Sequence, residues 1–282
     1  MKNYFEGWYF KQQHEEGTVA FIPAIHTNTN SQTASLQIVT ENDASCMNFS
    51  IENVLLCRHR FFFALANNYF SLDGIHLDIH TKELEAEGNL HFESIQPPAY
   101  DVMGPFRFVP FLECRHSVFS MKHKVSGALK LNGKNLCFDC DNGYIEGDRG
   151  YSFPKRYLWS QCAFEDNSIM LSVADIPFAG FTFTGIIGIV LFHGQEYRLA
   201  SYLGAKVLSI GNGTASVRQG KYRLTVEQLG GDCKFLSAPI QGAMTRYIRE
   251  SISCRVHFQF FREETVLFDV ISENASFENE YE

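Results

Sequence analysis

Two carboxylates that stand two residues apart are the groups in this sequence best placed to do chemistry. In extended chain Glu146 and Asp148 share one face, and Trp159 and Gln161, with Lys155 shortly before them, form a second polar and aromatic group downstream. If this segment borders an apolar cavity, desolvation raises the pKa of a carboxyl there, which could then donate a proton near neutral pH. The alternative interpretation is a solvated turn that carries its charges on the outside.

Three further titratable residues, Glu113, His116 and His123, stand in or beside an otherwise apolar stretch, residues 106–121. In a cavity a histidine of this kind could relay a proton, and a carboxyl could contact a ligand. The alternative for each residue is a hydrogen-bonded side chain in the core or at its rim. The sequence alone leaves both interpretations open.

A second pattern has the residue types of a metal site. His76, Asp78 and His80 fall on one face of an extended segment, a spacing that is compatible with metal ligation on a strand. No fourth ligand is evident in the sequence, so we interpret this face as the solvated side of a half-buried strand. We therefore expect no metal site here.

The elements that position these residues are predicted to be strands, because apolar residues recur with a period of two along most of the chain. Asn-Gly pairs at 132–133, 142–143 and 212–213 each predict a hairpin turn. The proline-rich segment 96–110 predicts a loop, and only residues 242–250 are expected to form a short helix. The sequence predicts an all-β fold.

A faint repeat predicts how the strands are organised. The aromatic residues 8–12, Trp-Tyr-Phe-Lys-Gln, are followed by an acidic turn and an apolar strand. About half a chain later, residues 157–161, Tyr-Leu-Trp-Ser-Gln, are also followed by an acidic turn and an apolar strand. A hairpin that recurs near the start of each half favours two similar β units. We predict an N-terminal unit over residues 1–130 and a C-terminal unit over residues 131–282.

The composition and the net charge limit the kinds of binding partner that we expect. The chain has 282 residues with 26 Phe, 12 Tyr and 2 Trp, which favours strands and thick aromatic cores or an apolar cavity. A net charge of −8 disfavours binding to nucleic acid. We see no signal peptide, and the longest apolar stretch, residues 185–192, is far below the roughly 20 residues that span a bilayer. Together with eight cysteines read as reduced thiols, this predicts a cytoplasmic protein.

Two segments together resemble the tocopherol-cyclase-like family. Residues 4–11, Tyr-Phe-Glu-Gly-Trp-Tyr-Phe-Lys, are close to its F-E-G-W-Y pattern, and residues 150–162 are close to its W-G-x-S-F-P-x-x-W-x-W-x-Q pattern. The chain departs from the second pattern at Arg149, where the family usually has Trp, at Tyr157, which replaces the first Trp of the pair, and at Ala163, where Asn often follows. These departures leave the substrate open.

The resemblance implies two lipocalin-like (calycin-type) β-barrel or sandwich halves with very little helix. It also implies acid-initiated cyclisation, isomerisation or hydration of an alkene in a hydrophobic, isoprenoid-like small molecule, without a redox cofactor. Asp148 would be the proton donor, with Glu146 or His116 as the relay. The residues expected to contact the substrate are Glu6, Trp8, Glu113, His123, Lys155, Trp159 and Gln161. One alternative is a protein that binds a hydrophobic ligand without changing it. Another is a structural role in which both motifs only pack.

Overall fold

Two antiparallel sheets account for nearly all of the computed structural model, which describes residues 2–14, 17–178 and 180–281. The first sheet has the strand order β4-β3-β2-β1-β11-β10-β9-β8-β7-β6-β5. Its strands are β1 (Tyr4–His14), β2 (Gly17–Thr27), β3 (Gln32–Thr40), β4 (Ala44–Ser50), β5 (Val54–Cys57), β6 (Phe62–Leu65), β7 (Asn68–Ser71), β8 (Gly74–His80), β9 (Glu85–Glu93), β10 (Cys114–Leu131) and β11 (Lys134–Gly150).

The second sheet has the order β15-β14-β13-β12-β21-β20-β18-β17-β16, and β19 pairs with β20 outside this path. Its strands are β12 (Tyr157–Phe164), β13 (Asn167–Phe178), β14 (Phe181–Phe192), β15 (Gln195–Ala200), β16 (Lys206–Gly211), β17 (Thr214–Gln219), β18 (Tyr222–Gly230), β19 (Lys234–Ile240), β20 (Ala243–Arg262) and β21 (Thr265–Asn279). Three short 3-10 helices connect strands: η1 (Ile51–Asn53), η2 (Gly104–Phe108) and η3 (Ser201–Leu203). Across the described ranges, no helix has the length and hydropathy to cross a bilayer.

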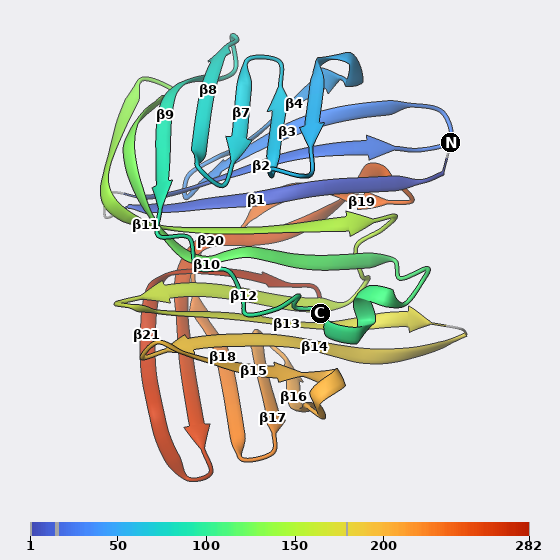
Figure 1. Ribbon diagram of the computed structural model, residues 1–282, viewed down its shortest axis with the longest axis vertical. Helices are drawn as coiled ribbons and strands as arrows, with labels where there is room; N and C mark the ends of the chain where they lie inside the picture. The colour runs from blue at the N-terminus through green and yellow to red at the C-terminus, as the bar shows by residue number, and fades with distance from the viewer. Residues whose placement is uncertain (1, 15–16, 179, 282) are drawn as a thin grey trace.

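The two sheets follow the same path, which confirms the prediction of an all-β fold with two similar halves. In the first sheet β1 lies between β2 and β11, and β10 follows β11; in the second β12 lies between β13 and β21, and β20 follows β21. The halves are stacked along the long axis, with their long strands in the middle and their short strands at the two ends (Figure 1). The chain passes from one sheet to the other at residues 151–156, so β11 belongs to the first sheet although it follows the predicted boundary at 130/131. A division into two independent domains stays a prediction.

The period-two alternation of the strands gives each half its own apolar core. The opposite faces of the same strands form a third apolar layer between the sheets. In β1, Trp8 and Phe10 pack into the first core, whereas Tyr9 points into the layer between the sheets. Phe258 and Phe260 of β20 face the second core in the same way. The aromatic-rich composition therefore fills three layers, because the inner strands of both sheets are covered on both faces.

Two of the three Asn-Gly turns are confirmed. Asn132-Gly133 and Asn212-Gly213 have positive φ at both residues and connect β10 to β11 and β16 to β17. The third prediction is wrong, because Gly143 lies inside β11. A Cβ atom at Gly143 would lie 2.1 Å from Nε2 of His123, so glycine is needed here for close packing and not for a turn.

The predicted helix at 242–250 is also wrong. Gly242 is a turn residue with φ of +76°, and β20 begins at Ala243. Along β20, Ile248, Glu250 and Ile252 are buried in alternation, which is the period of a strand. The correction matters for function, because this alternation points Glu250 into the layer between the sheets.

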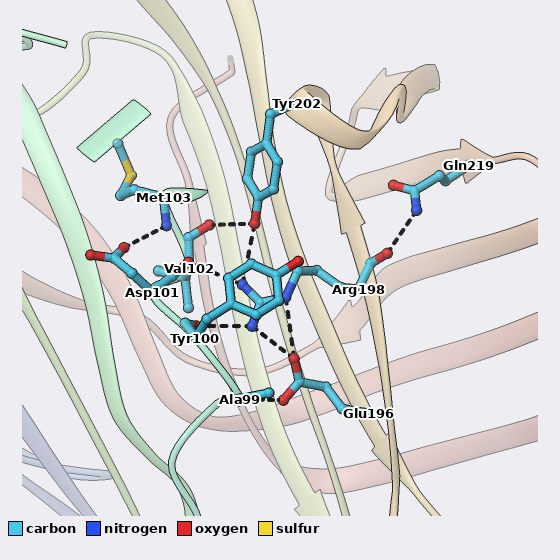
Figure 2. A network of polar contacts seen from close by, with 9 residues as sticks. All are labelled: Ala99, Tyr100, Asp101, Val102, Met103, Glu196, Arg198, Tyr202 and Gln219. Atoms are coloured by element: carbon cyan, nitrogen blue, oxygen red, sulfur yellow. Dashed lines mark hydrogen bonds and ion pairs between the residues drawn. The ribbon is translucent and has the colours of Figure 1, made fainter. Parts of the chain in front are cut away.

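The predicted loop at 96–110 is confirmed, and Arg198 of β15 fastens it to the second sheet (Figure 2). The Arg198 guanidinium donates to the backbone oxygens of Tyr100 at 2.9 Å and Asp101 at 3.1 Å, and it stacks over the Tyr100 ring at 3.6 Å. The Tyr202 hydroxyl donates to the Val102 oxygen at 3.2 Å. This loop therefore bridges the two halves and closes one side of the space between them.

Candidate active site

A cavity lies between the two sheets. Its volume is about 1390 Å³ when all the space up to and including the solvent-open mouth is counted. Most of its wall is apolar: Met103, Phe106 and Leu112 come from the bridging loop and its end, and β13 and β14 supply small and branched side chains. The rings of Tyr9 and Trp159 meet inside it, edge to face, with centroids 5.6 Å apart.

Glu146, Asp148 and His116 meet at one wall of this cavity. His116 of β10 and Asp148 of β11 are Cα partners across the two strands, and Glu146 follows on the same face of β11. His116 Nδ1 lies 3.1 Å from Asp148 Oδ1, and His116 Nε2 lies 3.3 Å from Glu146 Oε2. The first contact is a hydrogen bond; the second is an ion-pair distance without hydrogen-bond geometry, so Nε2 has no acceptor.

Two more donors meet the same oxygen of Glu146. The Tyr144 hydroxyl donates to Oε2 at 2.6 Å, and the Trp159 indole N–H donates to Oε2 at 3.1 Å. Trp159 belongs to the second sheet, so this bond links the two halves. Because these donors and the His116 imidazole all approach Oε2, Oε1 is left as the oxygen that can carry a proton.

The surroundings place a proton on Glu146 near neutral pH. Burial raises the pKa of Glu146 to about 7, against the opposing effect of the His116 charge. Burial alone would lower the pKa of His116, but the charges of Glu146 and Asp148 outweigh it and raise this pKa to about 9. The wall therefore contains a cationic imidazole that is paired with Asp148 and lies beside a carboxyl that can be neutral.

A second pair of carboxyls, Glu250 and Glu278, lines the same cavity. They are Cα partners on β20 and β21, and the Tyr157 hydroxyl donates to Glu278. No protein group among the described residues meets either oxygen of Glu250 in hydrogen-bonding geometry. The Tyr9 hydroxyl, which is in hydrogen-bond contact with Ser276 Oγ at 3.2 Å, also faces Glu250 and lowers its pKa as a looser hydrogen-bond donor. Burial raises the pKa of Glu250 to about 7 and that of Glu278 well above its usual value.

Sequence reasoning missed this second pair. Residues 242–250 were expected to be helical, which hid the inward alternation of β20, and Glu278 lies 28 residues farther along the chain. The available signal was a carboxylate at an inward position of a strand, between buried Ile248 and Ile252. Such a residue is rarely buried without a partner or a function.

Five of the ten residues predicted for the site line the cavity. These are Glu146, Asp148, His116, Trp8 and Trp159. Trp8 contributes to the wall, but its ring packs into the first core against Phe61 and Phe63, with centroids 5.5 Å and 4.7 Å away. The structure brings the three predicted proton-handling residues together, although their roles stay predictions.

The other five residues lie away from the cavity wall. Glu6 is paired with Arg58 and accepts from Tyr4, and Glu113 is buried outside the wall, where burial raises its pKa to about 7. His123 packs against Phe92 in the first core, where burial lowers its pKa to about 3. Lys155 is exposed to solvent. Gln161 is buried, and its side-chain oxygen accepts a hydrogen bond from Lys11 Nζ at 3.4 Å. Ligand contacts by these five stay predictions that their positions do not favour.

His116, Glu146 and Asp148 also have ligand atoms within 4.8 Å of one another, a spacing that could hold a metal ion. An ion there would compete with the proton of His116, because Nδ1 of this imidazole is already bonded to Asp148. In contrast, His80 and Asp78, from the pattern that has the residue types of a metal site, form a solvent-exposed ion pair at 3.1 Å. These residues lie on the wet face of β8, in agreement with the interpretation made from the sequence.

The fold is similar to those of several solved structures. One is assigned as AttH from Nitrosomonas europaea, with a TM-score of 0.53 and 10% identity over 99% of this chain and 93% of that one. Kievitone hydratase from Nectria haematococca has a TM-score of 0.54 and 10% identity over 99% of this chain and 88% of that one. CghA has a TM-score of 0.62 and 8% identity over 98% of this chain and 88% of that one. No family model and no curated protein matches the sequence. At these identities the likeness shows a shared fold.

Proposed function

We propose that this protein is an enzyme that protonates an alkene in a hydrophobic, isoprenoid-like molecule and directs cyclisation, hydration or isomerisation of the resulting cation. The observation that carries the proposal is the buried Glu146, which can hold a proton near neutral pH and borders an aromatic cavity. A well-placed general acid contributes roughly 10²–10⁴-fold to a reaction rate. The hydratase named among the structural neighbours and the resemblance to the tocopherol-cyclase-like family agree with this chemistry.

In the proposed reaction Glu146 gives its proton to one alkene carbon, and a cation forms at the other. The carboxylate that remains is stabilised by the donors already bound to Oε2, Tyr144 and Trp159, and by the His116 cation. The faces of Tyr9 and Trp159 can stabilise the carbocation by about 0.5–2 kcal/mol each. Water or a hydroxyl of the substrate then adds to the cation, or a proton leaves it.

This geometry favours Glu146 over Asp148 as the proton donor. Asp148 accepts hydrogen bonds from the His116 imidazole at 3.1 Å and from the Cys114 thiol at 3.4 Å. We therefore assign Asp148 a positioning role: it orients His116 and keeps it cationic. In this proposal Glu146, which the sequence indicated as a relay, becomes the proton donor, and Asp148, which the sequence indicated as the donor, becomes a positioning residue.

The test is turnover of a defined probe, 2-geranylphenol, followed by mass spectrometry and chromatography of the products. Glu146→Gln should lower turnover by roughly 10²–10⁴-fold without loss of folding or probe binding. Asp148→Asn should lower it by only about tenfold and should shift the pH profile, because the acid remains. Glu273→Gln, an exposed carboxyl of β21 that is paired with Arg255, is the matched control.

The outcome also separates the enzyme from a carrier. Full activity in Glu146→Gln with none in Asp148→Asn would return the donor role to Asp148. Tight binding of the probe without any product in the wild-type protein would favour the alternative, a protein that carries a hydrophobic ligand unchanged. We also propose a cytoplasmic setting, with the hydrophobic small molecule as the partner.

A further inference from the structure

Glu250 is a carboxyl that the proposed proton donation does not use. Its side chain is 1% exposed, it lines the cavity, and no group of the described chain meets either of its oxygens in hydrogen-bonding geometry. A buried polar group without a partner costs about 1–3 kcal/mol, and more if it is charged. Such a cost is explained if the partner is a donor on the bound ligand.

The neighbours of Glu250 make it an acceptor that can hold a proton. Glu278 lies directly across on β21, and Tyr9 and Glu146 face the same space. Lys11 is the nearest cation whose charge acts on Glu250, but its Nζ is bonded to the Asn274 oxygen at 2.8 Å and lies outside the cavity wall. Two adjacent carboxyls in a dry site cannot both be ionised at low cost, so the pair readily takes up one proton.

We propose that Glu250, backed by Glu278, binds a hydroxyl group of the ligand and accepts its proton when the oxygen adds to the carbocation. This inference rests on the proposed function and deepens it, because it assigns the acceptor that the donor Glu146 requires. The two carboxyls come from different sheets and border one cavity, so donor and acceptor can act on two parts of a single molecule.

The proton balance of the step is complete. Glu146 gives a proton to one alkene carbon, so a C–H bond forms as the π bond breaks. The hydroxyl oxygen bonds to the other carbon, its O–H bond breaks, and that proton passes to Glu250. The product is an isomer of the substrate, or a hydrate if the hydroxyl belongs to water. Exchange of both carboxyls with water at the cavity mouth restores the starting state.

The wall also defines the class of substrate. Among the described residues that line the cavity, four are carboxylates and none is Lys or Arg. The His116 cation is already paired with Asp148, so a ligand with a phosphate, diphosphate or carboxylate group would find no free countercharge on the described part of this wall. The fitting substrate is therefore an uncharged phenol or alcohol with an apolar chain that contains an alkene.

The recognition part is tested by comparing the affinities of 2-geranylphenol and its methyl ether at pH 8. The wild-type protein should bind the phenol at least tenfold more tightly, because only the phenol donates to Glu250. In Glu250→Met, which removes the acceptor and keeps a similar volume, the preference should fall below twofold. An undiminished preference in Glu250→Met would overturn the proposal. Glu273→Gln, on the exposed side of the same pair of strands, β20 and β21, is the control for the loss of a carboxyl outside the cavity.

Turnover of the phenol tests the proton transfer. Glu250→Gln can still accept a hydrogen bond but is a poor base, so kcat should fall by about 10²-fold or more with KM nearly unchanged. Unchanged kcat would overturn the role of Glu250 as the base. The two proposals can be tested separately. Loss of turnover in Glu146→Gln with an intact preference for the phenol supports both assignments. A wild-type protein that prefers the phenol through Glu250 but makes no product would overturn catalysis and retain the binding site.

Discussion

The two acidic centres of this protein occupy corresponding places in the two sheets but have different neighbours. In the first sheet His116 and Asp148 are Cα partners on β10 and β11, and in the second sheet Glu250 and Glu278 are Cα partners on β20 and β21. The first centre has an imidazole between two carboxyls and several donors on Glu146. Among the described residues, the second has no cation between its carboxyls, and no donor meets Glu250 in hydrogen-bonding geometry, although the Tyr9 hydroxyl faces it.

Under the proposed function, the difference would let one sheet position serve two steps of a proton transfer. At the first centre the His116 cation and the Tyr144 hydroxyl favour the carboxylate that remains after Glu146 gives up its proton. At the second centre burial favours the protonated form of Glu250, and burial together with the charge of Glu250 favours that of Glu278, so this pair is the proposed place to receive a proton. The strands set the positions of the carboxyls, and the neighbouring side chains set the proposed direction of proton transfer.

Removal of the cation is expected to have the largest effect on this contrast. His116→Gln should lower the free energy of unfolding by about 3 kcal/mol at pH 7, because it leaves the buried Glu146 and the half-buried Asp148 without their countercharge. The folded-state pKa of His116 is raised to about 9, so its stabilisation is full below the unfolded value of about 6.5 and is lost as the pH rises through 9. The cost of the substitution should therefore shrink by pH 10.

Urea unfolding at pH 7 and pH 10 measures this trend. His123→Gln is the matched control, because burial lowers the pKa of His123 to about 3 and the imidazole is neutral at both pH values. Its cost should be the same at pH 7 and pH 10. An equal cost of His116→Gln at the two pH values would contradict a cationic imidazole between the carboxyls.

Substitution at the second centre should have the opposite effect on stability. The folded-state pKa of Glu250 is raised to about 7, so the wild-type protein loses stability as the pH rises from about 4.5 to 7, where the buried carboxyl must ionise. Glu250→Met lacks this penalty. Relative to wild type it should gain on the order of 1–3 kcal/mol between pH 4.5 and pH 8, as measured by urea unfolding. A difference that does not change with pH would show that Glu250 is not a buried titrating group.

The smallest effect concerns the two tyrosine hydroxyls that donate to carboxyls, one at each centre. Tyr144→Phe removes a donor from Glu146, so the pKa of Glu146 should rise above about 7 by less than one unit, or about 1 kcal/mol. Tyr157→Phe makes the matched change at Glu278. In pH profiles of probe turnover, only Tyr144→Phe should move the limb that reports the proton donor to higher pH. The same shift in both variants would argue against separate roles.

Much of the architecture was predictable because local rules decide it. Period-two alternation is a property of extended chain, so the strands and the shared face of Glu146 and Asp148 could be predicted from spacing. The apolar layer between the sheets could not, because residues of both halves form it. The hairpins at Asn132-Gly133 and Asn212-Gly213 followed from their need for positive φ. Gly143 broke this rule because its neighbour is His123 of the adjacent strand, a contact that no local pattern encodes.

The sequence by itself determined an all-β fold with two similar halves and pointed to the carboxylates of β11, because alternation, turn residues and aromatic composition act along the chain. Only the tertiary structure decided the surroundings of each carboxyl, and our choice of Glu146 as the proposed proton donor rests on those surroundings. The register of β10 on β11 places His116 beside Asp148, and the packing of the second sheet brings Trp159 to Glu146. A pKa depends on burial and on charges within a few ångströms. Those neighbours come from residues far apart in the chain.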